Sequence, residues 1–144
     1  MRDEPKEIRI TQPYGVGFSV DRNKISWEGW DVRVSLTPDE GVVLHELSLN
    51  DRPILFRAAM SDMVVPYGSA DPMHSWKAVH DGTDYGFGRL SNSLTLGCDC
   101  LGEIHYFNAS GISFDGSVEV IENAICLHEE DYGIQWKHND GMGA

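Results

Sequence analysis

The 144-residue sequence has few basic side chains, few cysteines and no long apolar run. Its 11 Lys and Arg residues face 23 Asp and Glu residues, so the net charge is −12 with neutral histidine. This balance argues against a nucleic acid or an anionic membrane surface as partner, because both require a basic face. No stretch approaches the roughly 20 apolar residues that span a bilayer. The first residues lack the apolar core of a secretory signal, so we expect a cytoplasmic protein, or a piece of a longer chain.

The composition is that of an ordinary globular domain, with 41% hydrophobic and 24% charged residues. We expect a flexible lead-in over residues 1–12 and one domain over residues 13–144, with no internal repeat. The three cysteines, Cys98, Cys100 and Cys126, form at most one disulfide, which excludes a disulfide-rich scaffold.

The hydrophobic pattern predicts an all-β fold of antiparallel strands. Residues 24–36 alternate around Gly29, residues 37–41 (TPDEG) form a turn, and a further strand leads to a turn at Asn50. Residues 53–60 fit a strand or a helical turn, and residues 73–88 fit a long loop or a short helix. Further strands are predicted over residues 89–100, 103–108, 117–128 and 133–137, with a hairpin turn at residues 114–116 (FDG).

Three segments, residues 40–68, 71–107 and 121–140, carry the motifs VVPYG, LGCDCLG and CLHEED in that order. Together with ITQPYG near the start, they resemble the catalytic domain of the copper amine oxidases over almost the whole chain. The resemblance implies a large dimeric β-sandwich. It also implies an enzyme that uses copper and topaquinone to oxidise primary amines with dioxygen, releasing aldehyde, ammonia and hydrogen peroxide.

Two residues receive catalytic roles from this resemblance. Asp81, in SWKAVHDGTDYG, lines up with the family's proton-abstracting base, and Tyr67, in VVPYG, with the tyrosine that hydrogen-bonds the quinone. Taken alone, Asp-Gly is a common turn dipeptide and Tyr67 fits a packing aromatic. Enclosure by Trp76, Tyr85 and Phe87 would desolvate Asp81 and raise its pKa, as suits a general base.

The resemblance also assigns the substrate channel and one disulfide. Tyr85 falls where the family lines its channel, and Val79 stands where many members carry an aromatic gate, which leaves the substrate's size open. Cys100 and Cys126 line up with the family's disulfide, leaving Cys98 free.

The cofactor motifs of the family are missing. The sequence has no Asn-Tyr dipeptide, the source of topaquinone, and no His-x-His copper pair. We therefore expect the front part of a catalytic domain, inactive alone, which carries the base but not the cofactor. The alternative is a non-catalytic β-sandwich binding module that retains the fold.

Other residues have simpler interpretations. A metal site at Cys98, Cys100 and His128 is disfavoured, because zinc ligands usually occur as C-x-x-C turns. The acidic run from His128 to Asp131 is read as a solvated strand end rather than a calcium site. We expect the four tryptophans in the sandwich core, at Trp27, Trp30, Trp76 and Trp136.

Overall fold

Seven strands make up the computed structural model, which describes residues 6–60, 66–74, 85–113, 115–134 and 136–138. They are β1 (Ser19–Asp21), β2 (Lys24–Trp27), β3 (Trp30–Thr37), β4 (Gly41–Leu49), β5 (Arg52–Ala59), β6 (His105–Ile112) and β7 (Val118–Leu127). All pairings between these strands are antiparallel, which confirms the predicted all-β class.

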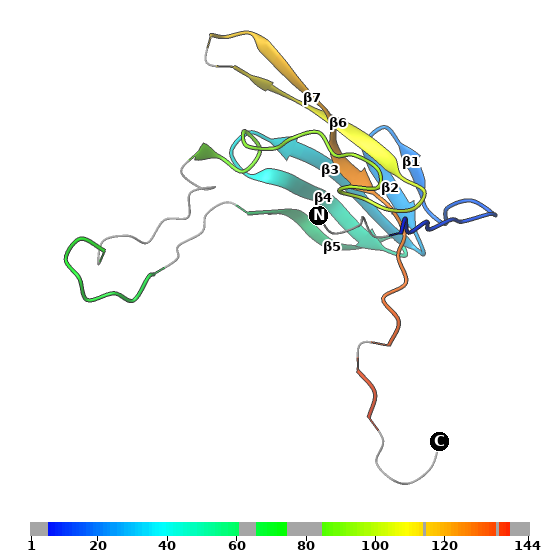
Figure 1. The fold of residues 1–144 in the computed structure, drawn as a ribbon. Coiled ribbons are helices and arrows are strands. Elements are labelled where there is room, and N and C mark those ends of the chain that lie inside the picture. Colours follow the sequence, from blue (N-terminus) through cyan, green and yellow to red (C-terminus); the bar gives the residue numbers. More distant parts are fainter. Residues whose placement is uncertain (1–5, 61–65, 75–84, 114, 135, 139–144) are drawn as a thin grey trace.

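The first five strands form one sheet in chain order, β1-β2-β3-β4-β5, joined by short turns (Figure 1). The β2–β3 turn places Glu28 and Gly29 at φ 48° and 83°, and the β4–β5 turn places Asn50 and Asp51 at φ 48° and 62°. Two successive positive φ values are what a tight hairpin of this twist requires. The predicted turns at residues 37–41 and at Asn50 are confirmed, and residues 53–59 belong to a strand, β5. The single strand expected over residues 24–36 is wrong, because Gly29 does not merely interrupt it but turns the chain between the antiparallel strands β2 and β3.

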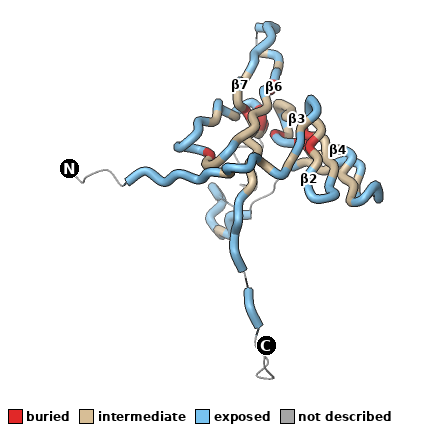
Figure 2. The backbone as a smooth tube through the Cα atoms, turned by 90° about the vertical axis from the view of Figure 1, so that its right-hand side faces the viewer, coloured by how far each residue is buried: buried red, intermediate tan, exposed pale blue. Residues whose placement is uncertain are grey.

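A separate hairpin, β6–β7, lies across the sheet and contacts it through β6 and β3 (Figure 1). The predicted strands over residues 103–108 and 117–128 correspond to these two, although β6 continues to Ile112. The buried apolar residues come from both layers and from the turn that ends at Cys100, and Figure 2 shows the buried stretches in red. They are Ile25, Val34, Val43, Cys100, Ala109 and Ala124.

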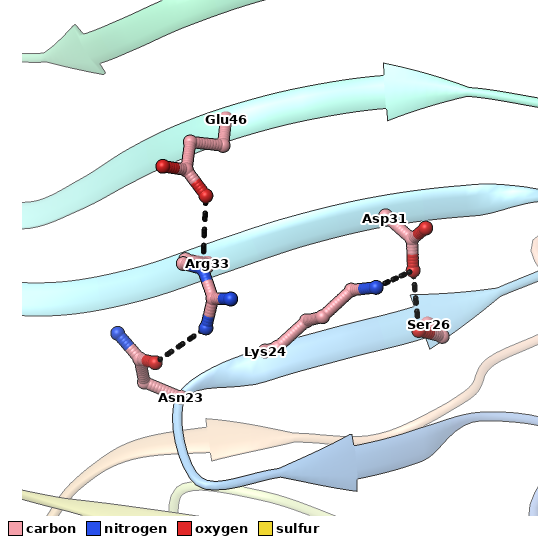
Figure 3. Close-up of polar contacts among 6 residues, drawn as sticks. All are labelled: Asn23, Lys24, Ser26, Asp31, Arg33 and Glu46. Atoms are coloured by element: carbon pink, nitrogen blue, oxygen red, sulfur yellow. Dashed lines mark hydrogen bonds and ion pairs between the residues drawn. The ribbon is translucent and has the colours of Figure 1, made fainter. Parts of the chain in front are cut away.

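Cross-strand polar pairs reinforce the register of β2, β3 and β4 (Figure 3). Asp31 accepts hydrogen bonds from the Ser26 hydroxyl and from Lys24 Nζ at 3.1 Å, and these contacts hold the pKa of Asp31 below its ordinary value. On the neighbouring pair of strands, Arg33 Nε donates to Glu46 Oε2 at 2.9 Å. These polar side chains alternate along the strands with the buried apolar ones, as the pleat requires.

The strand predicted over residues 89–100 is wrong. These residues form turns, and their only pairing is an isolated bridge between Leu96 and Cys100. Local hydrogen bonds explain the difference, because Asp99 Oδ2 accepts from Thr95 N at 2.7 Å and Gly97 takes φ 86°. A side chain that binds nearby backbone in this way competes with strand pairing.

The strand predicted over residues 133–137 is also wrong at its described positions, which pair with no strand (Figure 1). Asp131 Oδ1 accepts from Gly133 N at 2.6 Å, which favours a turn there. The tryptophan core is wrong for the described tryptophans: Trp27, Trp30 and Trp136 are 45%, 36% and 77% exposed. The remaining one, Trp76, and most of the predicted loop over residues 73–88 lie outside the described residues.

Candidate functional site

Residues 87–89, which follow Tyr85 in the chain, are docked on the β3–β4 turn through backbone hydrogen bonds and are called the docked segment. Phe87 N donates to the Asp39 carbonyl at 3.0 Å, and the next two amides, of Gly88 and Arg89, donate to the Pro38 carbonyl at 3.0 and 2.9 Å. A Cβ added at Gly88 would overlap the carbonyl of Thr37. Glycine is therefore needed for the backbones to approach this closely.

The same turn is bound to strand β5 by an ion pair. Arg57 donates a hydrogen bond to Glu40 Oε2, and the Thr37 hydroxyl donates to the same oxygen at 3.3 Å. The guanidinium of Arg57 is the main cause of the lowered pKa of Glu40. The turn at residues 37–40 thus joins β5, which precedes Tyr67, to the segment that follows Tyr85.

Of the predicted catalytic and channel residues, Tyr67 and Tyr85 have described positions. Tyr67 follows β5 by eight residues and is 60% exposed, and Tyr85 is 66% exposed next to the docked segment. Both phenol rings thus keep most of their surface open to a ligand or to another part of a larger protein. Asp81 and Val79 lie outside the described residues, so their catalytic and channel roles stay predictions.

The structure contains the disulfide that the family resemblance implies. Cys100 and Cys126 are bonded with their Cα atoms 6.9 Å apart, and Cys98 is free and exposed. The bond joins the turn over residues 95–100 to strand β7. Nearby, Leu94 N donates to the Asn123 carbonyl at 3.0 Å, so the stretch between Arg89 and β6 is fixed to the hairpin at two points.

One cluster in the structure was missed by sequence reasoning. Glu129, interpreted as part of a solvated strand end, is half-buried and accepts hydrogen bonds from Gln12 Nε2 at 2.6 Å, Gly17 N at 2.7 Å and Trp27 Nε1 at 2.6 Å. The Gly17 amide is the main cause of its lowered pKa, followed by Gln12 and Trp27. No local motif signals this site, because its members are up to 117 positions apart in sequence.

The residues of this chain do not fit the cofactors that the resemblance implies. Among the described residues, no three or more His, Cys, Asp or Glu side chains gather closely enough to hold a metal ion. Over the whole sequence there is neither an Asn-Tyr dipeptide nor a pair of histidines two residues apart. This chain therefore lacks both the family's precursor motif for topaquinone and the family's His-x-His motif for copper.

Comparison with known proteins decides the family. The family model described as "Copper amine oxidase, enzyme domain" matches residues 19–144. The chain belongs to the copper amine oxidase family. Members of this family use copper and topaquinone, the cofactors expected for the complete enzyme.

Curated relatives in the family are much longer than this chain. A "Primary amine oxidase" of Arthrobacter sp. (strain P1) is 49% identical over 143 residues, which cover 96% of the chain but 22% of the relative. A "Histamine oxidase" of Arthrobacter globiformis is 46% identical, with 97% of the chain and 21% of the relative covered. The chain thus spans about a fifth of the length of these relatives.

A solved copper amine oxidase shares the fold. The crystal structure of a copper-containing benzylamine oxidase from Hansenula polymorpha superposes with a TM-score of 0.80 at 40% identity, covering 97% of this chain and 22% of the other. The neighbour supports the β-sandwich assignment. In the part of the chain that the structure describes, no helix has the length and apolarity to cross a membrane.

Proposed function

We propose that this chain is part of the catalytic domain of a primary-amine oxidase. The complete enzyme would use copper and topaquinone to convert a primary amine and dioxygen to aldehyde, ammonia and hydrogen peroxide. The observation that carries the proposal is the 49% identity to a "Primary amine oxidase" over 143 residues. Because the chain covers only 22% of that relative, the activity is proposed for the longer protein and not for these residues alone.

Within that enzyme, Asp81 accepts the proton from the α-carbon of the substrate amine, and the Tyr67 hydroxyl donates a hydrogen bond toward the quinone. Tyr85 and Val79 line the approach of the substrate. What supports the position of Tyr85 is the described framework next to it, because residues 87–89 are hydrogen-bonded to the β3–β4 turn and Arg57 joins that turn to β5.

The rest of the enzyme supplies what this chain lacks. Copper and topaquinone provide the electron-accepting chemistry, and their binding residues belong to the portion of the family's domain outside these residues. We further propose that residues 1–12 are a lead-in and that residues 13–144 are an incomplete catalytic domain. The complete enzyme is proposed to assemble as a homodimer and to be cytoplasmic. Three relatives have "peroxisomal" in their names, so fractionation of the complete protein tests the location.

Replacement of Asp81 by Asn in the complete enzyme tests the proposal. The amide keeps the shape of the side chain but is a far weaker base, so amine-dependent peroxide release should fall by at least ~10²–10⁴-fold. Quinone formation, followed by its visible absorbance, should be retained. Asp131→Asn is the matched control, because an amide oxygen can still accept the Gly133 hydrogen bond. Near-normal turnover in Asp81→Asn would contradict the assignment of the base.

The 144-residue chain alone should release no peroxide from primary amines, even with copper added. A base without an electron-accepting cofactor cannot remove the weakly acidic α-proton of an amine. The measurement compares this chain with the complete enzyme in one peroxide assay. An inactive complete protein that shows no quinone absorbance would instead favour a non-catalytic binding module.

A further inference from the structure

A small cavity beside Glu129 differs from the rest of the surface in its lining. It has a volume of about 170 Å³ and lies between the ends of β2 and β7. Three of its lining side chains are aromatic, and Glu129 is the single ionisable residue among those that line it. The aromatic residues are Phe18, Trp27 and Trp30.

The two tryptophans of the cavity are only partly buried. Trp27 and Trp30 pair across the β2–β3 turn and keep 45% and 36% of their surface exposed. Each residue therefore buries more than half of its surface and leaves the remainder open. Because both residues line the cavity, part of their open surface is available to a ligand there.

The carboxylate of Glu129, at the edge of the cavity, is held in place and charged. Trp27 Nε1 donates to Glu129 Oε1, while Gln12 and Gly17 donate to Oε2, so three different parts of the chain fix its orientation. An ionised carboxylate has about four lone-pair positions, and these donors occupy three. The hydrogen bonds also lower the pKa of Glu129, so they favour its ionised form.

We propose that this cavity binds a small organic ammonium ion, with the rings of Phe18, Trp27 and Trp30 around the cation and Glu129 as its counter-charge. Aromatic rings attract a desolvated cation through their quadrupole, and quaternary ammonium groups are recognised by cages of this composition. The net charge of −12 further favours the approach of cations over anions. The proposal concerns a binding site and is independent of amine oxidation.

Calorimetric titration of the chain with choline tests the proposal. The comparison ligand is 3,3-dimethylbutan-1-ol, in which a quaternary carbon replaces the nitrogen, so the shape is kept and the charge removed. Sodium chloride is added to match the ionic strength. We expect choline to bind and the neutral analogue to bind roughly 3- to 30-fold more weakly, as the strength of cation–π contacts predicts. Equal binding of both ligands, or no binding of choline, would overturn the proposal.

Two variants test the assigned residues independently. Trp30→Leu keeps an apolar side chain without a ring, and Glu129→Gln keeps the size of the acid without its charge. Each should weaken choline binding roughly 3- to 30-fold. Trp136→Leu is the control, because this exposed tryptophan stacks on His138 away from the cavity lining. The folded state of each variant is checked by circular dichroism, and either folded variant with unchanged affinity would overturn the proposal.

Discussion

The segments that carry Tyr67 and Tyr85 are held in different ways. After Tyr85, three successive amides donate to carbonyls of the β3–β4 turn, so the strand framework fixes this segment. After Tyr67, the hydrogen bonds of Asp71 with Ser69, Met73 and His74 reach only two or three residues along the chain. The Tyr85 side of the site is therefore coupled to the sheet, whereas the described contacts of Asp71 shape the Tyr67 side locally.

The largest loss of stability is expected from removal of the Cys100–Cys126 disulfide, which follows the docked segment in the chain. The Cys100–Cys126 bond closes a loop with a sequence separation of 26. On the chain-entropy model such a loop contributes about 3.5 kcal/mol. A variant with alanine at both positions should lower the free energy of unfolding in urea by about that amount.

A matched control for the disulfide is Cys98→Ser, which removes the exposed thiol and should change stability by less than about 0.5 kcal/mol. Thiol counting on the unfolded, unreduced chain should find one free thiol, Cys98. Three reactive thiols, or a double variant as stable as the parent, would show that the bond does not constrain the chain in solution.

Glycine-to-alanine changes test the contrast between the two tyrosine segments directly. A methyl group at Gly88 would overlap the Thr37 carbonyl and detach a segment that makes three backbone hydrogen bonds. At about 1 kcal/mol for each bond, we expect Gly88→Ala to cost about 2–3 kcal/mol in urea unfolding. Gly68 has φ 66° and nothing within 4 Å of an added Cβ, so Gly68→Ala should cost only about 1 kcal/mol. Equal costs would mean that the docking of residues 86–89 contributes no stability.

The sequence was most informative where structure is decided by neighbouring residues. Asn50-Asp51 is a turn pair between alternating strands and forms the expected tight turn, and Gly29, expected to interrupt a strand, also lies in a tight turn. The same logic failed for residues 89–100, because the Asp99 side chain takes a backbone amide that a strand would have used for pairing. Alternation of apolar residues does not show whether a partner strand exists.

Contacts between distant residues could not be predicted from these patterns. The Cys100–Cys126 pairing came from family resemblance, since three cysteines alone allow several pairings. The Glu129 cluster had no such guide, because neither HEED nor the tryptophan spacing indicates that an acid and an indole meet across 102 positions. Strand positions follow from local chemistry, whereas the cavity beside Glu129 depends on how the layers pack.

The smallest change in stability is expected from Glu129, which accepts charge-assisted hydrogen bonds from Gln12, Gly17 and Trp27. The pKa of Glu129 is lowered from its ordinary value of 4.5, so the folded chain binds the proton less tightly than the unfolded chain does. Its stabilising contribution is fully present above that value and is lost as the pH falls through the folded pKa.

Acid titration of the urea midpoint isolates this contribution. The urea concentration at the midpoint of unfolding should decrease as the pH is lowered below about 4.5 in the parent chain. In Glu129→Gln this decrease should be less steep. Other carboxylates with lowered pKa values add to the acid slope in both proteins, so only the difference reports on Glu129; these are Asp31, Glu40 and Asp115. Glu130→Gln, an exposed neighbour, should keep the parent's slope. Parallel curves for the parent and Glu129→Gln would show that the three hydrogen bonds do not favour the ionised acid, and that the lead-in is held by packing alone.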